Sequence, residues 1–294
     1  MMLRLLSVLS VLVFVNCVDN LNFPLVLPPF GEGADVKKPE SSWGTCLLYL
    51  ESVNVIVYKK QDGKAYVASI NSTKDAGHTY KFETKYVNCS NASEVSSNLF
   101  ILYINTKSSV PAIENGETQF TVDGPIVLKL NFTTNKRGAV WGLTSVKLDN
   151  DLVIKKSGNF LDKDITVKNG QEIMEKSIKK MAVGGYFDYN YACSNTKFGV
   201  FANASDNFQV GISFGNLQVQ NEGYAVDKDE DYPHFSHNVN DCVGTFSAGS
   251  WMGILVSLLL ATVLIFGFLM LNSVQTTDRF DDPKQKQLII NFKD

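Results

Sequence analysis

The stretch WMGILVSLLLATVLIFGFLML, Trp251–Leu271, has no charged side chain and no proline. A helix rises about 1.5 Å per residue, so this stretch reaches roughly 30 Å, the thickness of the hydrocarbon core of a bilayer. A helix buried in a soluble protein would show a polar face somewhere in such a run. The sequence therefore predicts one membrane-spanning helix over residues 251–271.

The charges on either side of this segment predict its orientation. Arg279, Lys284 and Lys286 follow it, whereas the twenty residues before it contain neither Lys nor Arg. Because Lys and Arg on short flanking segments stay on the cytoplasmic side, we expect residues 272–294 to form a cytosolic tail. Trp251 lies where an interfacial indole is expected on the luminal side. The chain is thus predicted to be a type I single-pass protein with a luminal N-terminus, held in the lipid bilayer by one helix.

The N-terminus agrees with that topology. Arg4 precedes an apolar run from Leu5 to Val15 that is too short to span a bilayer, and Val15 and Cys17 form a small-residue cleavage site. We therefore expect residues 1–17 to be a secretory signal peptide.

Cleavage after Cys17 leaves four cysteines in an oxidising compartment, and an even number there implies two disulfides. Four cysteines allow three pairings, and the sequence alone does not select one. We favour the pairs that each close a local loop, which are Cys46 with Cys89 and Cys193 with Cys242.

Five Asn-x-Ser/Thr sequons lie upstream of the membrane segment, and the tail has none. Their confinement to the side assigned to the lumen predicts a glycosylated ectodomain. The acceptors are Asn71, Asn88, Asn91, Asn131 and Asn203. A net charge of -3 with 45% hydrophobic and 11% aromatic residues describes a globular protein, and we expect no nucleic-acid partner.

Composition divides the rest of the chain. Residues 18–45 are rich in Pro and Gly and predict an extended linker, whereas short β-rich runs bounded by Gly, Asn and Asp predict one antiparallel β domain over 46–226. Acidic residues then predict a solvated stalk over 227–250. The β-rich runs are Leu47–Tyr58, Ala65–Ile70, Leu99–Asn105, Ile126–Phe132, Val140–Leu148, Phe198–Phe201 and Phe208–Val219.

Two of these segments have a clear period. Phe208, Val210, Ile212 and Phe214 alternate with Gln209, Gly211, Ser213 and Gly215, which predicts a strand with one buried face. Apolar residues recur at helical spacing among charged ones at Met174, Ile178 and Met181, and predict a single amphipathic helix.

The residues of common catalytic sites are sparse. The three histidines, His78, His234 and His237, have no Gly-x-Ser-x-Gly elbow, phosphate loop or zinc-spaced Cys set to accompany them. His234 and His237 near Asp residues are open to interpretation as a metal or pH-sensing pair, but we prefer a solvated stalk. We expect no enzymatic activity, no cofactor and no metal.

The membrane segment carries small residues at successive i+4 positions: Gly249, Gly253, Ser257 and Ala261. Small side chains on one face let another helix approach closely, so this ladder predicts helix packing rather than simple anchoring. The alternative is chance enrichment of small residues.

Several motifs resemble the accessory subunit 1 family of the vacuolar-type proton ATPase. They are DCVGTFSAGSWMG at 241–253, LQVQ at 217–220, YAC at 191–193 and TDRFDDPK at 277–284. The last motif places Asp278, Arg279, Phe280, Asp281 and Asp282 shortly after the single helix, which a generic anchor does not need.

This resemblance implies a non-catalytic glycoprotein that packs its helix against the proteolipid ring in the pump's membrane sector. The expected role is to assist pump assembly, traffic and luminal acidification in the endoplasmic reticulum, secretory and endolysosomal membranes. The expected luminal fold is a β-prism similar to lysosome-associated membrane glycoproteins, with two disulfides.

The first alternative is a lysosome-associated glycoprotein or single-pass receptor without pump association. Such proteins usually carry a tyrosine-based sorting signal, and this tail has no tyrosine. A luminal enzyme is a third interpretation.

Overall fold

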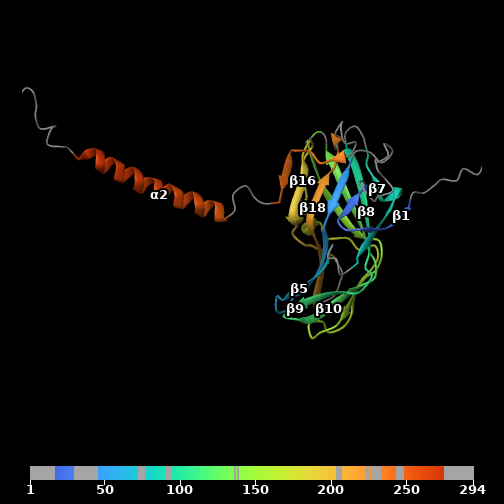
Figure 1. The fold of residues 1–294 in the computed structure, drawn as a ribbon. Helices are drawn as coiled ribbons and strands as arrows, with labels where there is room; N and C mark the ends of the chain where they lie inside the picture. The colour runs from blue at the N-terminus through green and yellow to red at the C-terminus, as the bar shows by residue number, and fades with distance from the viewer. Residues whose placement is uncertain are drawn as a thin grey trace, which may run out of the picture. The chain divides into compact units, whose positions relative to one another are not determined.

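The computed structural model describes residues 17–29, 46–71, 77–90, 95–135, 137, 139–202, 207–222, 225–226, 233–242 and 248–274. The chain forms two compact units, Met1–Cys242 and Val243–Asp294 (Figure 1). Strands dominate the first, which we call the β unit, and the second contains the helix α2 (Ala248–Ser273). The expectation of a mainly β chain with one C-terminal apolar helix is therefore confirmed.

The β unit contains three main sheets. The seven-stranded sheet has the order β1-β6-β8-β11-β12-β15 with β7 added to β8, and the four-stranded sheet has the order β14-β13-β10-β9. Strands of the seven-stranded sheet are β1 (Cys17–Asn22), β6 (Thr79–Glu83), β7 (Val87–Asn88), β8 (Val95–Asn105), β11 (Ile126–Asn135), β12 (Val140–Leu148) and β15 (Gly184–Tyr186). Those of the four-stranded sheet are β9 (Val110–Glu114), β10 (Glu117–Asp123), β13 (Leu152–Lys156) and β14 (Ile165–Val167).

The eight-stranded sheet is built around one long strand, β18 (Phe208–Gln220). It pairs with four neighbours, so it lies inside the sheet. The other strands are β2 (Leu25–Leu27), β3 (Leu47–Leu50), β4 (Ser52–Lys59), β5 (Ala65–Asn71), β16 (Asn190–Asn195), β17 (Gly199–Val200) and β21 (Val239–Asp241). The remaining elements are the two-stranded pair β19 (Ala225–Val226) and β20 (Pro233–His234), the 3-10 turn η2 (Thr84–Tyr86) and the helix α1 (Glu175–Met181).

Strand β18 changes its buried face partway along. The predicted alternation holds as far as Phe214, but Leu217 and Val219 are the next core residues, three and five positions later. Between them, Asn216 has a φ of 48°, in the left-handed region. A strand residue there rotates the following side chains onto the opposite face.

The neighbouring strands make the same change at the same level. Leu48 and Leu50 are buried in β3, whereas Val53 and Val55 are buried in β4. The N–H of Glu51, between these strands, donates to the Gly215 carbonyl at 3.2 Å. β18 and the β3–β4 segment therefore switch phase at the same level, and each keeps a continuous apolar face. We call this line the bend.

The bend lets one sheet contribute to two parts of the core. Figure 1 shows β5, β9 and β10 gathered at one end of the β unit, whereas β7, β8 and β16 lie at the other. At the first end Phe160 packs edge-on against Phe208, with ring centroids 5.5 Å apart, and lies 6.4 Å from Phe120. At the other end Phe132 contacts Phe100 at 5.8 Å.

A buried polar network joins the seven-stranded and eight-stranded sheets where β18 ends. The Asn98 amide donates to the Asn221 carbonyl oxygen at 2.6 Å and accepts from the Ser90 N–H at 2.7 Å. Asn221 in turn donates to the Thr134 hydroxyl. Asn98, Thr134 and Asn221 are at most 1% exposed. Buried polar groups require such partners, so the network fixes how the two sheets align.

Two of the expected boundaries are wrong. The interval 18–45 was expected to be a linker, but β2 lies within it and β1 begins just before it, at Cys17. Leu25 and Leu27 are fully buried because β2 pairs with β3. The prolines beside these residues end strands rather than mark a linker.

The expected stalk over 227–250 also contains part of the β unit. Strand β21 pairs with β16, and Asp241 lies opposite Ala192. This pairing is parallel, so the sheet is not purely antiparallel as expected. The unit extends to Cys242.

The predicted amphipathic helix is α1. Ile178 and Met181 are 6% and 2% exposed, whereas Met174 lies at the N-cap and is 36% exposed. The helix ends at Ala182, which adopts the left-handed conformation of a C-cap and donates its N–H to the Ile178 carbonyl.

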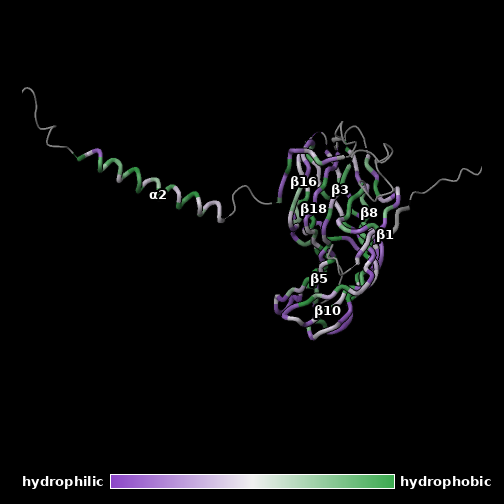
Figure 2. Tube along the Cα trace, in the orientation of Figure 1, coloured by the Kyte–Doolittle hydropathy of each residue, from purple (hydrophilic) through white to green (hydrophobic). Residues whose placement is uncertain are grey.

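The apolar residues of helix α2 are distributed differently from those of the β unit. Apolar residues follow one another along most of its length in Figure 2, whereas they alternate with hydrophilic ones in the β unit. Residues Gly249–Ser273 have the length and hydropathy to cross a membrane, and the described part of the chain buries no residue of an apolar 18-residue window within them.

Candidate interaction surfaces

The small-residue ladder lies along one ridge of α2. Residues four apart are neighbours on a helix but drift by about 40° per step, so Gly249, Gly253, Ser257 and Ala261 form an inclined ridge. A Cβ added at Gly253 would meet no heavy atom within 4 Å other than those of its chain neighbours and of the adjacent helix backbone. A second helix laid along this ridge would cross at roughly -40°, the geometry of small-xxx-small pairs.

The hydroxyl groups of α2 are satisfied within the helix. Ser257 donates to the Ile254 carbonyl at 2.9 Å, and Thr262 donates to the Leu259 carbonyl at 2.7 Å. Neither group needs water, as the interior of a bilayer requires. The ladder can therefore face lipid or another helix without leaving a hydroxyl group unsatisfied.

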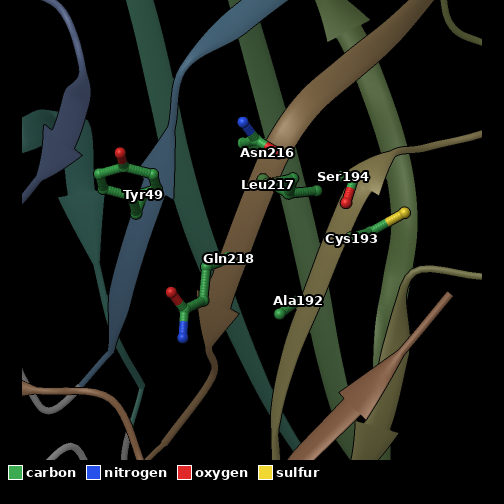
Figure 3. A pocket seen from close by; sticks show the side chains of 7 residues that line it. All are labelled: Tyr49, Ala192, Cys193, Ser194, Asn216, Leu217 and Gln218. Atoms are coloured by element: carbon green, nitrogen blue, oxygen red, sulfur yellow. The ribbon is translucent and has the colours of Figure 1, made fainter.

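A shallow pocket of about 240 Å³ opens at the bend, on the outward face of the eight-stranded sheet (Figure 3). Tyr49, Gln218 and Ala192 lie opposite one another on adjacent strands and form its floor. The remaining lining residues are Cys193, Ser194, Asn216 and Leu217. The register explains the LQVQ and YAC motifs, because Leu217, Val219, Tyr191 and Cys193 are buried while Gln218 and Ala192 face out.

The Glu51 carboxylate ties the bend together beside this pocket. It accepts from the Tyr49 hydroxyl at 2.7 Å and from the Asn216 amide at 2.6 Å. Burial, and then the Glu51 carboxylate, raise the pKa of Tyr49 to about 12. The hydrogen bonds from Asn216 and Tyr49 lower the pKa of Glu51. The Tyr49 hydroxyl beside the pocket therefore stays protonated, and the Glu51 carboxylate stays ionised, near neutral pH.

Both disulfides join the pairs favoured on loop length. Cys46 is bonded to Cys89, and Cys193 is bonded to Cys242. The first links the start of β3 to the segment after β7, and so connects two sheets. The second fixes the end of β21 to β16, at the last residue of the β unit.

Two of the predicted glycan acceptors share one face of the seven-stranded sheet. Asn88 and Asn131 both lie opposite Leu99, one on each side of it, in a single cross-strand row. The Ser97 hydroxyl donates to the Asn131 side-chain oxygen at 2.7 Å. Asn71 ends β5, whereas Asn91 and Asn203 lie outside the described residues.

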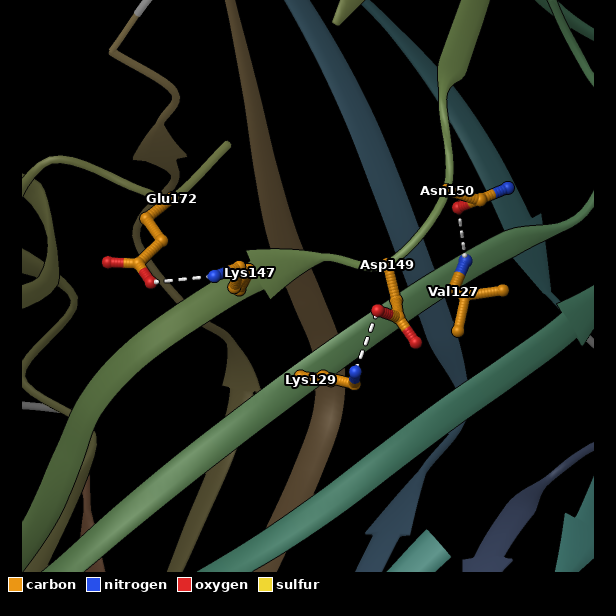
Figure 4. A network of polar contacts seen from close by, with 6 residues as sticks. All are labelled: Val127, Lys129, Lys147, Asp149, Asn150 and Glu172. Carbon is orange, nitrogen blue, oxygen red and sulfur yellow. Dashed lines mark hydrogen bonds and ion pairs between the residues drawn. The ribbon is translucent and has the colours of Figure 1, made fainter. Parts of the chain in front are cut away.

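Beside this row, polar contacts hold the turn between β12 and β13 (Figure 4). Lys129 pairs with Asp149 at 2.7 Å, and the Asn150 side-chain oxygen accepts from the Val127 N–H at 2.9 Å. Lys147 lies 3.6 Å from Glu172. These charges are partly exposed, so they position the turn more than they stabilise it.

Other predicted site residues remain without a structural account. The tail motif at 278–282 lies outside the described residues. His234 and His237 have ring centroids 6.0 Å apart, and no group of three potential metal ligands occurs in the described part of the chain.

Sequence reasoning missed Glu51 and Asn216. The available signal was the change of phase between Phe214 and Leu217, which strict alternation does not allow.

Comparison with known proteins adds to these observations. Residues 244–282 match the family model of the V0 complex accessory subunit Ac45/VOA1 transmembrane domain. The chain is 30% identical to V-type proton ATPase subunit S1 of Caenorhabditis elegans over 92% of its own length and 60% of that protein's. It is 36% identical to the Drosophila melanogaster subunit S1 over 35% of this chain and 26% of that protein. The chain thus spans less than two thirds of these relatives.

Solved structures also match, at low similarity. The membrane-proximal domain of mouse lysosome-associated membrane protein 1 is 16% identical, with a TM-score of 0.29, over 68% of this chain and 89% of that one. Human LAMP-3 is 12% identical with a TM-score of 0.30, over 68% of this chain and 91% of that one.

A disulfide-linked β unit followed by one membrane-spanning helix defines a single-pass membrane protein. The sequence matches are specific enough to name the group. Both matches point to the same group: the chain is similar to the accessory subunits called V-type proton ATPase subunit S1.

Proposed function

We propose that this protein is a non-catalytic accessory subunit of the vacuolar-type proton pump. The observation that carries the proposal is the match to the C. elegans subunit S1, which extends over 92% of this chain and so includes both units. The transmembrane family model, which matches residues 244–282, supports the same assignment. In this role the protein assists pump assembly, traffic and luminal acidification in the endoplasmic reticulum, secretory and endolysosomal membranes.

In this proposal α2 acts by packing within the membrane sector, against the proteolipid ring. No residue from Ala248 to Val274 is ionisable, so the helix offers no proton relay of its own. Its inclined ridge of small residues offers a close-packing surface instead.

The experiment is affinity purification of the tagged full-length protein in mild detergent, with identification of co-purifying subunits. Gly253→Leu adds bulk to the ridge and keeps the segment apolar, so insertion is preserved while close packing is lost. Leu259→Ile on another face is the matched control. We expect Gly253→Leu to reduce recovery of membrane-sector subunits and to raise luminal pH, and the control to behave as wild type.

Recovery of the same subunits with Gly253→Leu would contradict the packing role. Failure of the wild type to recover any pump subunit would contradict the whole proposal. A lysosome-associated glycoprotein or receptor would then be the better interpretation.

The proposed orientation places the β unit in the lumen, with cleavage of a signal peptide and N-glycans at several sequons. We expect a glycosidase that removes N-glycans to increase gel mobility by several kilodaltons. Asn88→Gln and Asn131→Gln should each remove one glycan, whereas Asn195→Gln, which alters no sequon, is the control. An unchanged mobility in protein from animal cells would contradict the orientation.

A further inference from the structure

A largely apolar groove lies beside α1, away from the bend. Its volume is about 750 Å³, within the range of ligand and peptide sites. Met174, Phe198 and Val200 provide its apolar lining. Phe198 is 47% exposed and Met174 is 36% exposed. Exposed large apolar side chains in a groove indicate an interaction site.

The rim of this groove is positively charged. Lys176 and Lys180 lie one turn apart on α1, and Lys197, which precedes Phe198 in the sequence, also lines the groove. None of the three makes an ion pair among the described residues. The nearby carboxylates are already paired, Glu175 with Lys179 at 2.6 Å and Glu172 with Lys147 at 3.6 Å.

This local excess of positive charge contrasts with the chain as a whole, whose net charge is -3. The groove is thus complementary to a ligand that combines negative charge with an apolar group.

Beside the groove, β17 packs closely on β18. Gly199 of β17 pairs with Ile212 of β18, and a Cβ on Gly211 would lie 2.7 Å from the Gly199 carbonyl oxygen and 3.3 Å from the Phe198 ring. Only glycine at Gly211 allows β17 and Phe198 to lie this close. Phe198 is therefore held at the groove edge before any partner arrives.

The backbone of this region offers a partner little to bind. The Met174 N–H donates to the Val200 carbonyl at 2.9 Å, so the outer edge of β17 is already covered. A partner therefore has to be recognised by its side chains rather than by adding a strand.

We propose that this groove binds an acidic peptide segment of a partner protein, with an apolar side chain seated between Met174 and Phe198 and carboxylates paired with Lys176, Lys180 and Lys197. The proposal goes beyond the pump assignment and does not depend on it, because the site uses only residues of the β unit.

The test is selection from a random short-peptide library on the full-length protein in nanodiscs of neutral lipid. We expect the selected peptides to combine Asp or Glu with Leu or Phe. Reversing the rim with Lys176→Glu, Lys180→Glu and Lys197→Glu should weaken their binding about tenfold or more, and salt should weaken wild-type binding. Phe198→Ala should also weaken it. The control reverses three exposed lysines elsewhere, Lys64, Lys107 and Lys163, and should leave binding unchanged.

Circular dichroism keeps a folding defect separate from a loss of affinity. Peptides without acidic enrichment, or equal binding by the rim-reversed variant, would overturn the proposal. So would selective binding of phosphatidylserine vesicles through the same lysines in the absence of peptide binding, since the groove would then be a lipid surface. None of these assays contains a pump subunit, so failure here leaves the pump assignment unaffected.

Discussion

The β unit buries its leucines, whereas α2 exposes them. Leu128 and Leu130 of β11 are 0% exposed, whereas Leu259 and Leu264 of α2 are 62% and 73% exposed. The β unit removes its apolar surface from water by packing sheets on one another. Helix α2 has no such cover from the described part of its own chain, so lipid or another helix must provide it. The β unit specifies its own structure, and the helix depends on its surroundings.

Polar groups show the same contrast. The β unit satisfies Asn98 with residues far away in sequence, whereas α2 satisfies Ser257 and Thr262 within one turn. Substitutions in the β unit should therefore change its own stability, and substitutions on α2 should change only what it binds.

The largest effect is expected from loss of a disulfide. The Cys193–Cys242 loop has a sequence separation of 49 residues. Replacing both cysteines by Ser should lower the free energy of unfolding by about 4 kcal/mol in the chain-entropy model. This corresponds to roughly 10 °C in thermal scans of the purified chain. Non-reducing peptide mapping provides the check on pairing, and a Cys89–Cys193 link would refute it.

A smaller loss is expected from the buried polar network. Asn98→Leu leaves the Ser90 N–H and the Asn221 carbonyl without this partner. The expected cost is about 1–3 kcal/mol, or roughly 5 °C in the same scans. Ser97→Ala is the control, because Ser97 is exposed and lies next in sequence. Equal melting temperatures for the two variants would contradict a structural role for the network.

The third effect is a pH dependence from His78, which is 8% exposed. Burial lowers the pKa of His78 below 6.5. The folded state therefore favours the neutral ring, and its stability is lost as pH falls from about 6.5 through the lower folded pKa. When the pH is lowered from about 7.5 to about 5.5, the free energy of unfolding of His78→Leu should decrease less than that of wild type. His237→Gln, at an exposed histidine, is the control, and an unchanged pH slope in His78→Leu would rule out this contribution.

The smallest change in stability is expected from Gly253→Leu. Its new side chain meets open space in this chain, so the melting temperature of the β unit should remain within about 1 °C of wild type. A clear decrease would show that the helix and the β unit depend on each other energetically. A loss of pump co-purification could then no longer be assigned to packing alone.

Regular periodicity made much of the fold predictable. The alternating residues of β18 up to Phe214, the helical spacing in α1 and the apolar run of α2 each identify an element correctly. The period identifies the element in β18 and α1, and the length of the uninterrupted apolar run identifies it in α2.

Features that depend on long-range pairing were not predictable. β2 has only three residues, and Leu25 is buried because β3 pairs with it. At the bend, Glu51 and Asn216, 165 positions apart in sequence, are joined by a hydrogen bond. The cationic groove likewise combines α1 with Lys197 and Phe198 from another segment. Composition and period describe neighbours in the chain, whereas these features need neighbours in space.

The Cys193–Cys242 bond also determines how mechanical load travels through the molecule. Cys242 is the last residue of the β unit, so tension on the membrane anchor reaches the sheet through this residue. Its sulfur is bonded to Cys193 in β16, which pairs in turn with the long central strand β18. Tension from the bilayer therefore passes covalently into an interior strand, and the few hydrogen bonds of β21 do not have to bear it.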